Sequence, residues 1–343
     1  MLRYFGFSGL LTVAAIIGAF IWLGPSGAIS AAILIAIEVA FSFDNAILNA
    51  KILDRLPALW RKLFLTVGMV IAILGMRFIF PIAIVAVTAH LKWTTVIDDA
   101  LHHPSVYAAH LHGAHASIAA FGGAFLLTLV LYFFLDHERE IVWLARLERP
   151  LQRLEGAVWV APLVGLLAVG AVATVAGEDR GVVIRAGVTG VVSYVVMKLF
   201  IDALGRLTGE TSKQMYSGWG ALLAFMYLEL LDASFSFDGV LGAFAITDKV
   251  ILIALGLGVG AIWVRSLTVF LVEKGTLSEY IYLEHGAHYA IFVLAVALLG
   301  SVLFEIPDAV TGIAGLGVIG ASYLASREVI RSQADRQTDS AAA

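Results

Sequence analysis

Long apolar stretches alternate with short polar segments along almost the whole chain. Ten of them reach spanning length, at residues 4–23, 28–50, 63–89, 116–135, 157–176, 183–204, 217–246, 250–272, 287–304 and 308–325. A transmembrane helix needs about 20 mostly apolar residues, so each stretch predicts one span. The third and seventh stretches are long enough to tilt or to break. The pattern predicts an all-α, polytopic integral membrane protein with about ten transmembrane helices.

The composition agrees with a protein of the lipid bilayer. Of the 343 residues, 60% are hydrophobic and only 14% are charged, whereas about a quarter of the residues in a soluble domain are charged. The net charge of -4 and the lack of a basic stripe argue against a nucleic-acid partner. The chain has no cysteine, which excludes disulfides, thiolate metal sites and thiol catalysis.

The N-terminal segment resembles a signal peptide, because one arginine precedes an apolar run. It lacks a small-residue cleavage site, and the next apolar run begins after only Gly24-Pro25-Ser26-Gly27. We therefore interpret residues 4–23 as a retained first span.

Basic residues are distributed unevenly between the two sets of loops. With the N-terminus inside, fifteen of them fall on the cytoplasmic side: Arg3, Lys51, Arg55, Arg61, Lys62, Arg139, Arg146, Arg149, Arg153, Arg206, Lys213, Lys274, Arg327, Arg331 and Arg336. Four fall outside: Lys92, Arg180, Arg185 and Lys249. Because cytoplasmic loops are enriched in lysine and arginine, this bias predicts an even number of spans with both termini cytoplasmic.

One acidic motif occurs twice inside the apolar stretches. Phe-Ser-Phe-Asp ends at Asp44 in the second stretch and again at Asp238 in the seventh. A carboxylate lies six residues before each aspartate, at Glu38 and Asp232, and Glu229 adds a fifth acid. Carboxylates within a membrane are costly and usually functional.

The two copies of the motif run in opposite directions across the membrane. The second stretch runs from outside to inside and the seventh from inside to outside, which predicts a five-plus-five inverted-topology repeat. We expect residues 1–180 and 181–326 to form the two five-helix repeats, and residues 327–343 to form a polar cytoplasmic tail. Transporters commonly build a midplane site where such repeats meet.

The spacing of the acids leaves two local structures open. Residues six apart on a continuous helix point about 120° away from each other, whereas Glu38, Asn45 and Asn49 share a face. Either each motif helix is unwound near Phe-Ser-Phe, or its acids serve different parts of the site. We favour unwinding, because transporter sites often use interrupted helices, and Gly239 and Gly242 would help the second copy to bend.

The available donors indicate the kind of ion. Carboxylate, amide and carbonyl oxygens suit Mn²⁺, Mg²⁺ or Ca²⁺, and their dominance argues against Zn²⁺ or Cu⁺. Clustered carboxylates in a low dielectric need a cation or protons to neutralise them. The same groups are therefore suited to bind a divalent ion in one state and protons in another, which is the basis of antiport. The alternative is that the acids are hydrogen-bonded structural groups.

Three basic residues fall within predicted spans. Arg77 and Arg265 follow their motif aspartates by 33 and 27 residues, so each is a possible charge-compensating partner of an acid when no ion is bound; snorkelling or structural pairing is the alternative. Lys198 and Asp202 are one turn apart and predict a structural pair.

Two polar segments lie between the spans. Six histidines (His90, His102, His103, His110, His112 and His115) lie on the predicted outer side with Asp98 and Asp99. They form either a weak metal-binding antechamber or a solvated amphipathic loop. Residues 136–156 predict an interfacial helix at the cytoplasmic face.

Segments 38–49 and 229–247 resemble the TerC-like integral membrane proteins, and most closely the larger uncharacterised branch of that family. The second segment is the more specific, because its acidic spacing and its Ala-Phe-Ala-Ile-Thr ending both fit. The family is named for tellurium resistance, and several members are linked to manganese export across the bacterial plasma membrane. The chain is longer than the familiar seven-span members, and Gly239 stands where those often have serine.

The resemblance implies a location in the bacterial inner membrane and a set of site residues. Carried over by position, the ligands are Glu38, Asp44, Asn45, Asp232 and Asp238. Asn49 and Glu229 are expected to support these ligands or to couple transport to protons.

We expect a secondary transporter, not an enzyme, that exports a divalent cation by alternating access, with proton entry as a possible coupling reaction. The site lies between helices two and seven, and Mn²⁺ is favoured over Ca²⁺ or Mg²⁺. One alternative is a metal-binding membrane scaffold or sensor, for tellurium resistance or the metallation of exported proteins. Another is an intramembrane aspartyl protease, because two membrane aspartates on separate helices can form a dyad.

Overall fold

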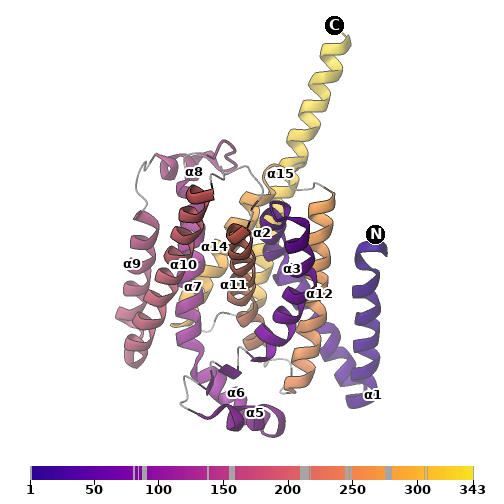
Figure 1. Ribbon diagram of the computed structural model, residues 1–343, viewed down its shortest axis with the longest axis vertical. Helices are drawn as coiled ribbons and strands as arrows, with labels where there is room; N and C mark the ends of the chain where they lie inside the picture. The colour runs from indigo at the N-terminus through magenta and orange to yellow at the C-terminus, as the bar shows by residue number, and fades with distance from the viewer. Residues whose placement is uncertain are drawn as a thin grey trace.

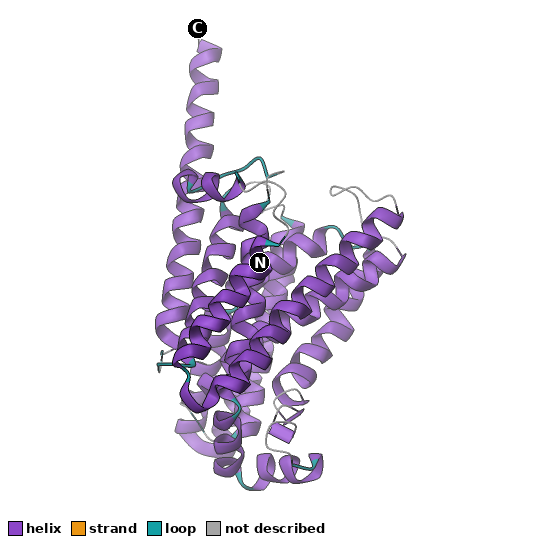
Figure 2. Cartoon of the chain, turned by 90° about the vertical axis from the view of Figure 1, so that its left-hand side faces the viewer, coloured by secondary structure: helices purple, strands orange, loops and turns teal. Residues whose placement is uncertain are grey.

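The described chain is built from helices alone (Figure 2). The computed structural model describes residues 2–342 except 80, 81, 84, 87–90, 137, 138, 154–158, 209–215, 217, 244–246, 248, 275–279, 305 and 307. For some residues within these helices, including Asp44 and Asp238, the structure describes the backbone but not the side chain.

The order of the helical elements follows the predicted stretches. The elements are α1 (Leu2–Phe41), α2 (Phe43–Asp54), α3 (Ala58–Val70), η1 (Ile71–Ile79), α5 (Trp93–His102), α6 (Pro104–Gly113), α7 (His115–Leu135), α8 (Ala145–Gln152), α9 (Val160–Val175), η2 (Gly177–Asp179), α10 (Arg180–Thr208), α11 (Gly218–Ala243), α12 (Val250–Glu273), α14 (Leu283–Ser301) and α15 (Asp308–Ala342).

Seven helices of the described chain are long and apolar enough to cross a bilayer. They are Arg3–Val39, Ala58–Gly75, His115–Leu135, Gly177–Leu199, Val250–Glu273, Leu283–Ser301 and Val310–Arg331. The chain is therefore an all-α, multi-pass membrane protein with about seven candidate spans. The predicted span at 157–176 corresponds to the shorter apolar helix Val160–Val175, and the one at 217–246 corresponds to the acidic helix α11.

The first candidate span is two helical arms joined at Gly24. Gly24 has φ 70° and ψ -159°, a backbone conformation that glycine adopts without steric cost, and Pro25 follows it at the start of the second arm. The break matches the polar gap that separates the predicted stretches 4–23 and 28–50.

Contacts with α12 show that the two arms of α1 are antiparallel. In the first arm, the Tyr4 hydroxyl donates to Glu273 over 2.7 Å and the Ser8 hydroxyl lies 2.7 Å from that of Ser266, so residue numbers rise along α1 as they fall along α12. In the second arm the numbers rise together, because Gly256 packs against Leu34 and Gly260 packs against Glu38. The chain therefore reverses direction at Gly24.

The helices form two flanks around a central group (Figure 1). α7, α9 and α10 pack together on one side, α1 and α12 pack together on the other, and the motif-bearing helices α2 and α11 contact each other between them. The termini and α8 lie towards one end of the bundle, whereas α5 and α6 lie at the opposite end. α7, α12 and α14 are mostly buried, whereas α1 exposes apolar side chains such as Phe7, Ile21 and Trp22, as expected for a lipid-facing helix.

Three segments differ in detail from the sequence-based predictions. The stretch at 63–89 changes from the α-helix α3 to the π-helix η1 after Val70. The histidine-rich segment, predicted as a loop, forms the short helices α5 and α6. Val96 and Ala100 in α5, and Tyr107 and Leu111 in α6, are four residues apart and buried in one hydrophobic cluster. In the described part of residues 136–156, where the sequence predicts an interfacial helix, the structure has the short helix α8, Ala145–Gln152.

Candidate site of buried ion pairs

The first motif lies where α1 passes into α2. Only Ser42 departs from helical geometry, with φ -98° and ψ 17°. Its N–H still donates to the carbonyl of Glu38 over 3.1 Å, and its own carbonyl accepts from Ala46 over 3.1 Å. The helix is therefore distorted at one residue and is not unwound, so the interpretation that we favoured from the sequence is wrong for the first motif.

The second motif is also helical. α11 runs without interruption from Gly218 to Ala243, and Gly239 and Gly242 lie inside it. A continuous helix satisfies its own backbone N–H and C=O groups, which are costly to leave unpaired away from water. The predicted unwinding is thus wrong for both copies, and the acids of each helix serve different parts of the site.

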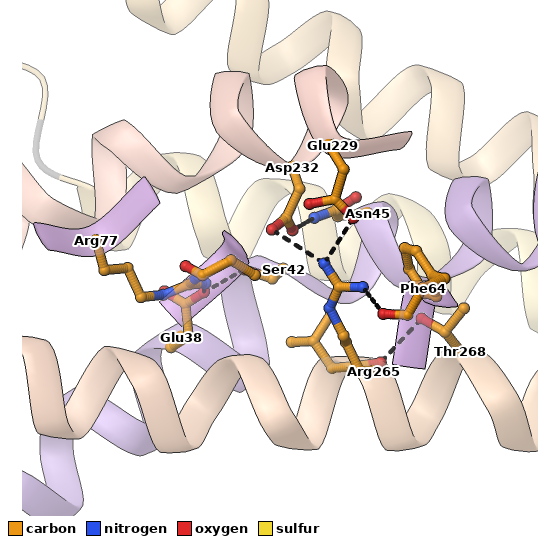
Figure 3. Close-up of polar contacts among 11 residues, drawn as sticks. Glu38, Ser42, Asn45, Phe64, Arg77, Glu229, Asp232, Arg265 and Thr268 are labelled. Carbon is orange, nitrogen blue, oxygen red and sulfur yellow. Dashed lines mark hydrogen bonds and ion pairs between the residues drawn. The ribbon is translucent and has the colours of Figure 1, made fainter. Parts of the chain in front are cut away.

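The first buried ion pair joins the end of α1 to η1. Glu38 and Arg77 are 3% and 4% exposed, and Nη2 of Arg77 donates to Oε1 of Glu38 (Figure 3). Nη1 of Arg77 donates to the carbonyl of Ala72 over 2.6 Å. The Ser42 hydroxyl donates to the same Glu38 oxygen over 3.2 Å, so the one distorted residue of the helix also orients the acid.

The second buried cluster joins α11 to α12. Nη2 of Arg265 lies 3.4 Å from Oε1 of Glu229 and 3.7 Å from Oδ2 of Asp232 (Figure 3). Nη1 of Arg265 donates to the carbonyl of Phe64 over 2.6 Å, and its guanidinium carbon lies 3.9 Å from the centre of the Phe64 ring. Arg265 is thus held by two carboxylates, a backbone carbonyl and an aromatic face.

A hydrogen bond connects the two motif helices. Nδ2 of Asn45, on α2, donates to Oδ1 of Asp232, on α11, over 2.8 Å. Asn45 is the residue directly after the first motif, and Asp232 is the acid six residues before the second aspartate. The bond therefore joins the two sequence-predicted halves of the site through residues that both belong to it.

The two clusters share one feature, an acid at the same motif position beside an arginine. Glu38 and Asp232 hold the same position relative to their motifs, and each lies against an arginine further along the chain, Arg77 of η1 or Arg265 of α12. A buried arginine keeps its charge, so in a low dielectric it is costly unless such partners balance it.

Two glycines allow the clusters to pack closely. A Cβ on Gly260 of α12 would lie 2.4 Å from Cβ of Glu38, and a Cβ on Gly68 of α3 would lie 2.4 Å from Oε1 of Glu229 and 2.8 Å from Nη1 of Arg265. The acid of each cluster is therefore packed against a glycine that is distant in the sequence: Glu38 against Gly260, and Glu229 against Gly68.

The described groups carry unused acceptor capacity. Three buried carboxylates face two guanidinium groups, which leaves one excess negative charge when all are ionised. Within the described residues, Oε2 of Glu229 and Oδ1 of Asn49 have no hydrogen-bond partner, although both residues are buried. Unpaired buried oxygens of this kind are costly and call for a ligand, a proton or water.

Other predicted ligands fall outside the described side chains. Asp44 and Asp238 are on helical backbone, but their side chains are among those that the structure does not describe. Among the side chains that it does describe, no three His, Asp or Glu groups are clustered as metal ligands.

The histidine-rich segment shows local contacts. Nδ1 of His102 lies 2.8 Å from Asp98 within α5, and Nε2 of His115 lies 3.3 Å from the carbonyl of Ser301. His103 and His112 are exposed, and His90 lies outside the described residues. The half-exposed pair of Lys198 and Asp202, on α10, has a separation of 3.1 Å.

One buried polar cluster has no counterpart in the sequence-based predictions. The Glu148 side chain of α8 is fully buried; its Oε1 accepts from the Leu144 N–H over 3.0 Å and from the Tyr289 hydroxyl over 3.2 Å. Its Oε2 lies 3.1 Å from Arg139 and 3.4 Å from His285 of α14. Burial lowers the pKa of Arg139 from its ordinary value, and the Glu148 carboxylate opposes that shift.

The sequence-based predictions also did not include Ser42 and Phe64 among the residues of the site. Ser42 is four residues after Glu38, a helical spacing that a search for acid-orienting groups would detect. Phe64 and Glu148 carry no such signal, because their partners Arg265 and His285 are more than a hundred residues away in sequence.

Fold and site together define a multi-pass α-helical membrane protein with paired acid–arginine clusters buried between its helices. Residues 43–334 match a family described as a protein of unknown function, DUF475, and the chain belongs to that family.

One curated relative is the uncharacterized membrane protein YceF of Bacillus subtilis (strain 168), which is 33% identical over 94 residues. This alignment covers 27% of the chain and 34% of the relative, so the chain matches about a third of the relative's length. No solved structure matches the chain.

Proposed function

We propose that the protein is a secondary transporter that exports a divalent cation, with Mn²⁺ favoured over Ca²⁺ and Mg²⁺. The observation that carries this proposal is the pair of buried acid–arginine clusters, linked by the bond between Asn45 and Asp232 inside a multi-pass bundle. Buried intramembrane charges of this kind characteristically mark ion pathways. The oxygen-rich donor set and the TerC-like resemblance favour Mn²⁺.

In this proposal the cation binds between α2 and α11. The ligands are Glu38, Asp44, Asn45, Asp232 and Asp238. Asn49 and Glu229, which offer unpaired oxygens beside this set, support the ligands or carry the coupling proton. Arg77 and Arg265 balance the acids when no cation is bound.

We further propose alternating access by two inverted repeats. The like construction of the two clusters supports this arrangement, because each repeat then supplies an acid and an arginine. The arms of α1 and the helices α9 and α11 then complete ten crossings of the bacterial inner membrane, with both termini cytoplasmic. The two termini lie towards the same end of the bundle, which supports that topology (Figure 1).

The test is Mn²⁺ efflux from loaded proteoliposomes that contain the purified protein. We expect Asp44→Asn and Asp238→Asn to reduce efflux to the rate of protein-free liposomes while both variants remain folded. Asp202→Asn is the matched control, because it removes a carboxylate from a helix pair outside the site, and it should retain wild-type efflux.

Two outcomes would contradict parts of this proposal. Unimpaired efflux in both motif variants would remove the site assignment. Mn²⁺ binding by the wild-type protein without any flux would instead favour a metal-binding scaffold or sensor, which needs the same donors but no alternating access.

A further inference from the structure

The two buried arginines are held in different ways. Arg265 is on a continuous α-helix and has partners from two other elements: the carboxylates of Glu229 and Asp232 on α11, and the carbonyl and ring of Phe64 on α3. Among the side chains that the structure describes, Arg77 has one partner outside its own segment, Glu38, and it donates otherwise to the Ala72 carbonyl. Its Nε has no hydrogen-bond partner within the described residues.

The segment that carries Arg77 is itself unusual. η1 is π-helical over nine residues, Ile71–Ile79, whereas π-helices are rare and appear mostly as single turns at functional sites. Ala72 lies five residues before Arg77, the spacing that hydrogen bonds of a π-helix bring together. The contact between Arg77 and Ala72 therefore depends on a backbone form that is less stable than the α-helix α3 before it in the chain.

A return of η1 to α-helix would turn Arg77 about the helix axis relative to α3. An α-helix advances about 100° per residue, and the wider π-helix advances by less, so the difference accumulates along the segment. Gly75, midway along η1, leaves space for such a change, because among the described side chains a Cβ there would meet only that of Ile71, at 3.5 Å. Ser42 would remain as a donor to Glu38 when Arg77 leaves.

We propose that the two ion pairs have different tasks. Arg77 is an exchangeable counter-ion that leaves Glu38 when the cation binds, through conversion of η1 towards α-helix. Arg265 stays in place and positions Glu229 and Asp232 in both states. This inference rests on the proposed transport of a divalent cation, and it assigns the moving part of the site to the first repeat.

Equilibrium binding of Mn²⁺ to the purified full-length protein separates the two roles. Arg77→Gln removes the internal competitor of the cation, so the Kd for Mn²⁺ should fall by about tenfold or more. Arg77→Lys retains a competing positive charge and should stay close to wild type. Arg265→Gln should weaken Mn²⁺ binding, because it leaves two carboxylates without their positioning group. Lys198→Gln, a change in an intramembrane pair outside the site, should not alter the Kd.

A second readout follows the backbone and does not depend on the stability of the arginine variants. The chain has no cysteine, so single cysteines report without background. Leu74 in η1 is 56% exposed and Val67 in α3 is 47% exposed. Mn²⁺ should change the rate at which N-ethylmaleimide modifies Leu74→Cys, and it should leave the rate for Val67→Cys unchanged.

The experiments distinguish failure of the proposed function from failure of the division of tasks between Arg77 and Arg265. Absence of Mn²⁺ binding and flux in the wild-type protein would remove the proposed function and the exchange with it. Normal binding and flux, with equal shifts of Kd in Arg77→Gln and Arg265→Gln or with unchanged Leu74→Cys reactivity, would overturn the division of tasks alone.

Discussion

At the scale of single residues, the molecule keeps charges in an apolar interior by giving each several partners. The guanidinium of Arg265 meets two carboxylates, a carbonyl and an aromatic face. The carboxylate of Glu148 accepts two hydrogen bonds at Oε1 and lies beside two basic side chains at Oε2. Removal of one partner from such a group leaves an uncompensated charge, which is far more destabilising than loss of a surface ion pair.

Phe64→Leu should weaken the hold on Arg265 while its backbone acceptor remains. The ring that faces the guanidinium at 3.9 Å is lost, and a desolvated cation–π contact is worth about 1–2 kcal/mol. Denaturant unfolding in detergent measures the change. Phe125→Leu, at an equally buried site in α7, controls for the smaller side chain, and equal destabilisation of the two variants would exclude a specific role of the Phe64 ring.

Glu148→Gln should release α8 from α14. The change keeps the shape of the side chain but leaves Arg139 beside a neutral partner, and loss of one member of a buried pair costs about 3–5 kcal/mol. Limited trypsin digestion should then cleave faster after the exposed Arg146. The exposed Glu140→Gln is the control, and the same cleavage rate in both variants would show that the cluster does not secure α8.

At the scale of elements, small residues decide how closely the helices approach. Gly68 and Gly260 each lie against the acid of a motif helix at a distance that a side chain cannot occupy. Close approach through glycine is a common means of helix association in membranes. The ion pairs are therefore positioned by the packing of α3 and α12 as well as by their own charges.

Gly68→Ala should disrupt the second cluster. The new methyl group would lie 2.4 Å from Oε1 of Glu229, so the acid and Arg265 must separate. Overpacking of this kind costs about 1–3 kcal/mol, and we expect a lower unfolding midpoint together with reduced Mn²⁺ efflux. Gly170→Ala on α9 is the matched control, since a Cβ there meets nothing within 4 Å. Wild-type efflux in Gly68→Ala would show that transport does not require the packing of the second cluster.

At the scale of the whole molecule, the arrangement of the helices bears on the predicted orientation. α8 and both termini lie towards one end of the bundle (Figure 1), and the distribution of lysine and arginine in the sequence predicts all three on the cytoplasmic side. The chain reverses direction at Gly24. A topology of ten crossings requires this turn to face the outside.

Single-cysteine labelling tests that topology in the naturally cysteine-free chain. Ser26→Cys and His103→Cys should react with a membrane-impermeant maleimide in intact cells. Arg146→Cys and Arg331→Cys should react only after permeabilisation; all four positions are exposed. Labelling of Ser26→Cys and Arg331→Cys from the same side would show that the number of crossings between them is even, against the proposed topology.

The sequence by itself determined the class of the protein, the order of its helices and the candidate residues. The length of an apolar run is enough to predict that it lies in lipid. A duplicated acidic motif within such runs can be recognised without any knowledge of packing. The break at Gly24-Pro25 could also be anticipated, because both residues act through their own backbone.

Only the tertiary structure decided how the candidate residues meet. The motif helices stay wound because backbone hydrogen bonds outweigh the tendency of Ser42, Gly239 and Gly242 to interrupt them. The π-helical form of η1, the aromatic face beneath Arg265 and the buried Glu148 each depend on partners distant in the chain, and such contacts leave no local periodic signal.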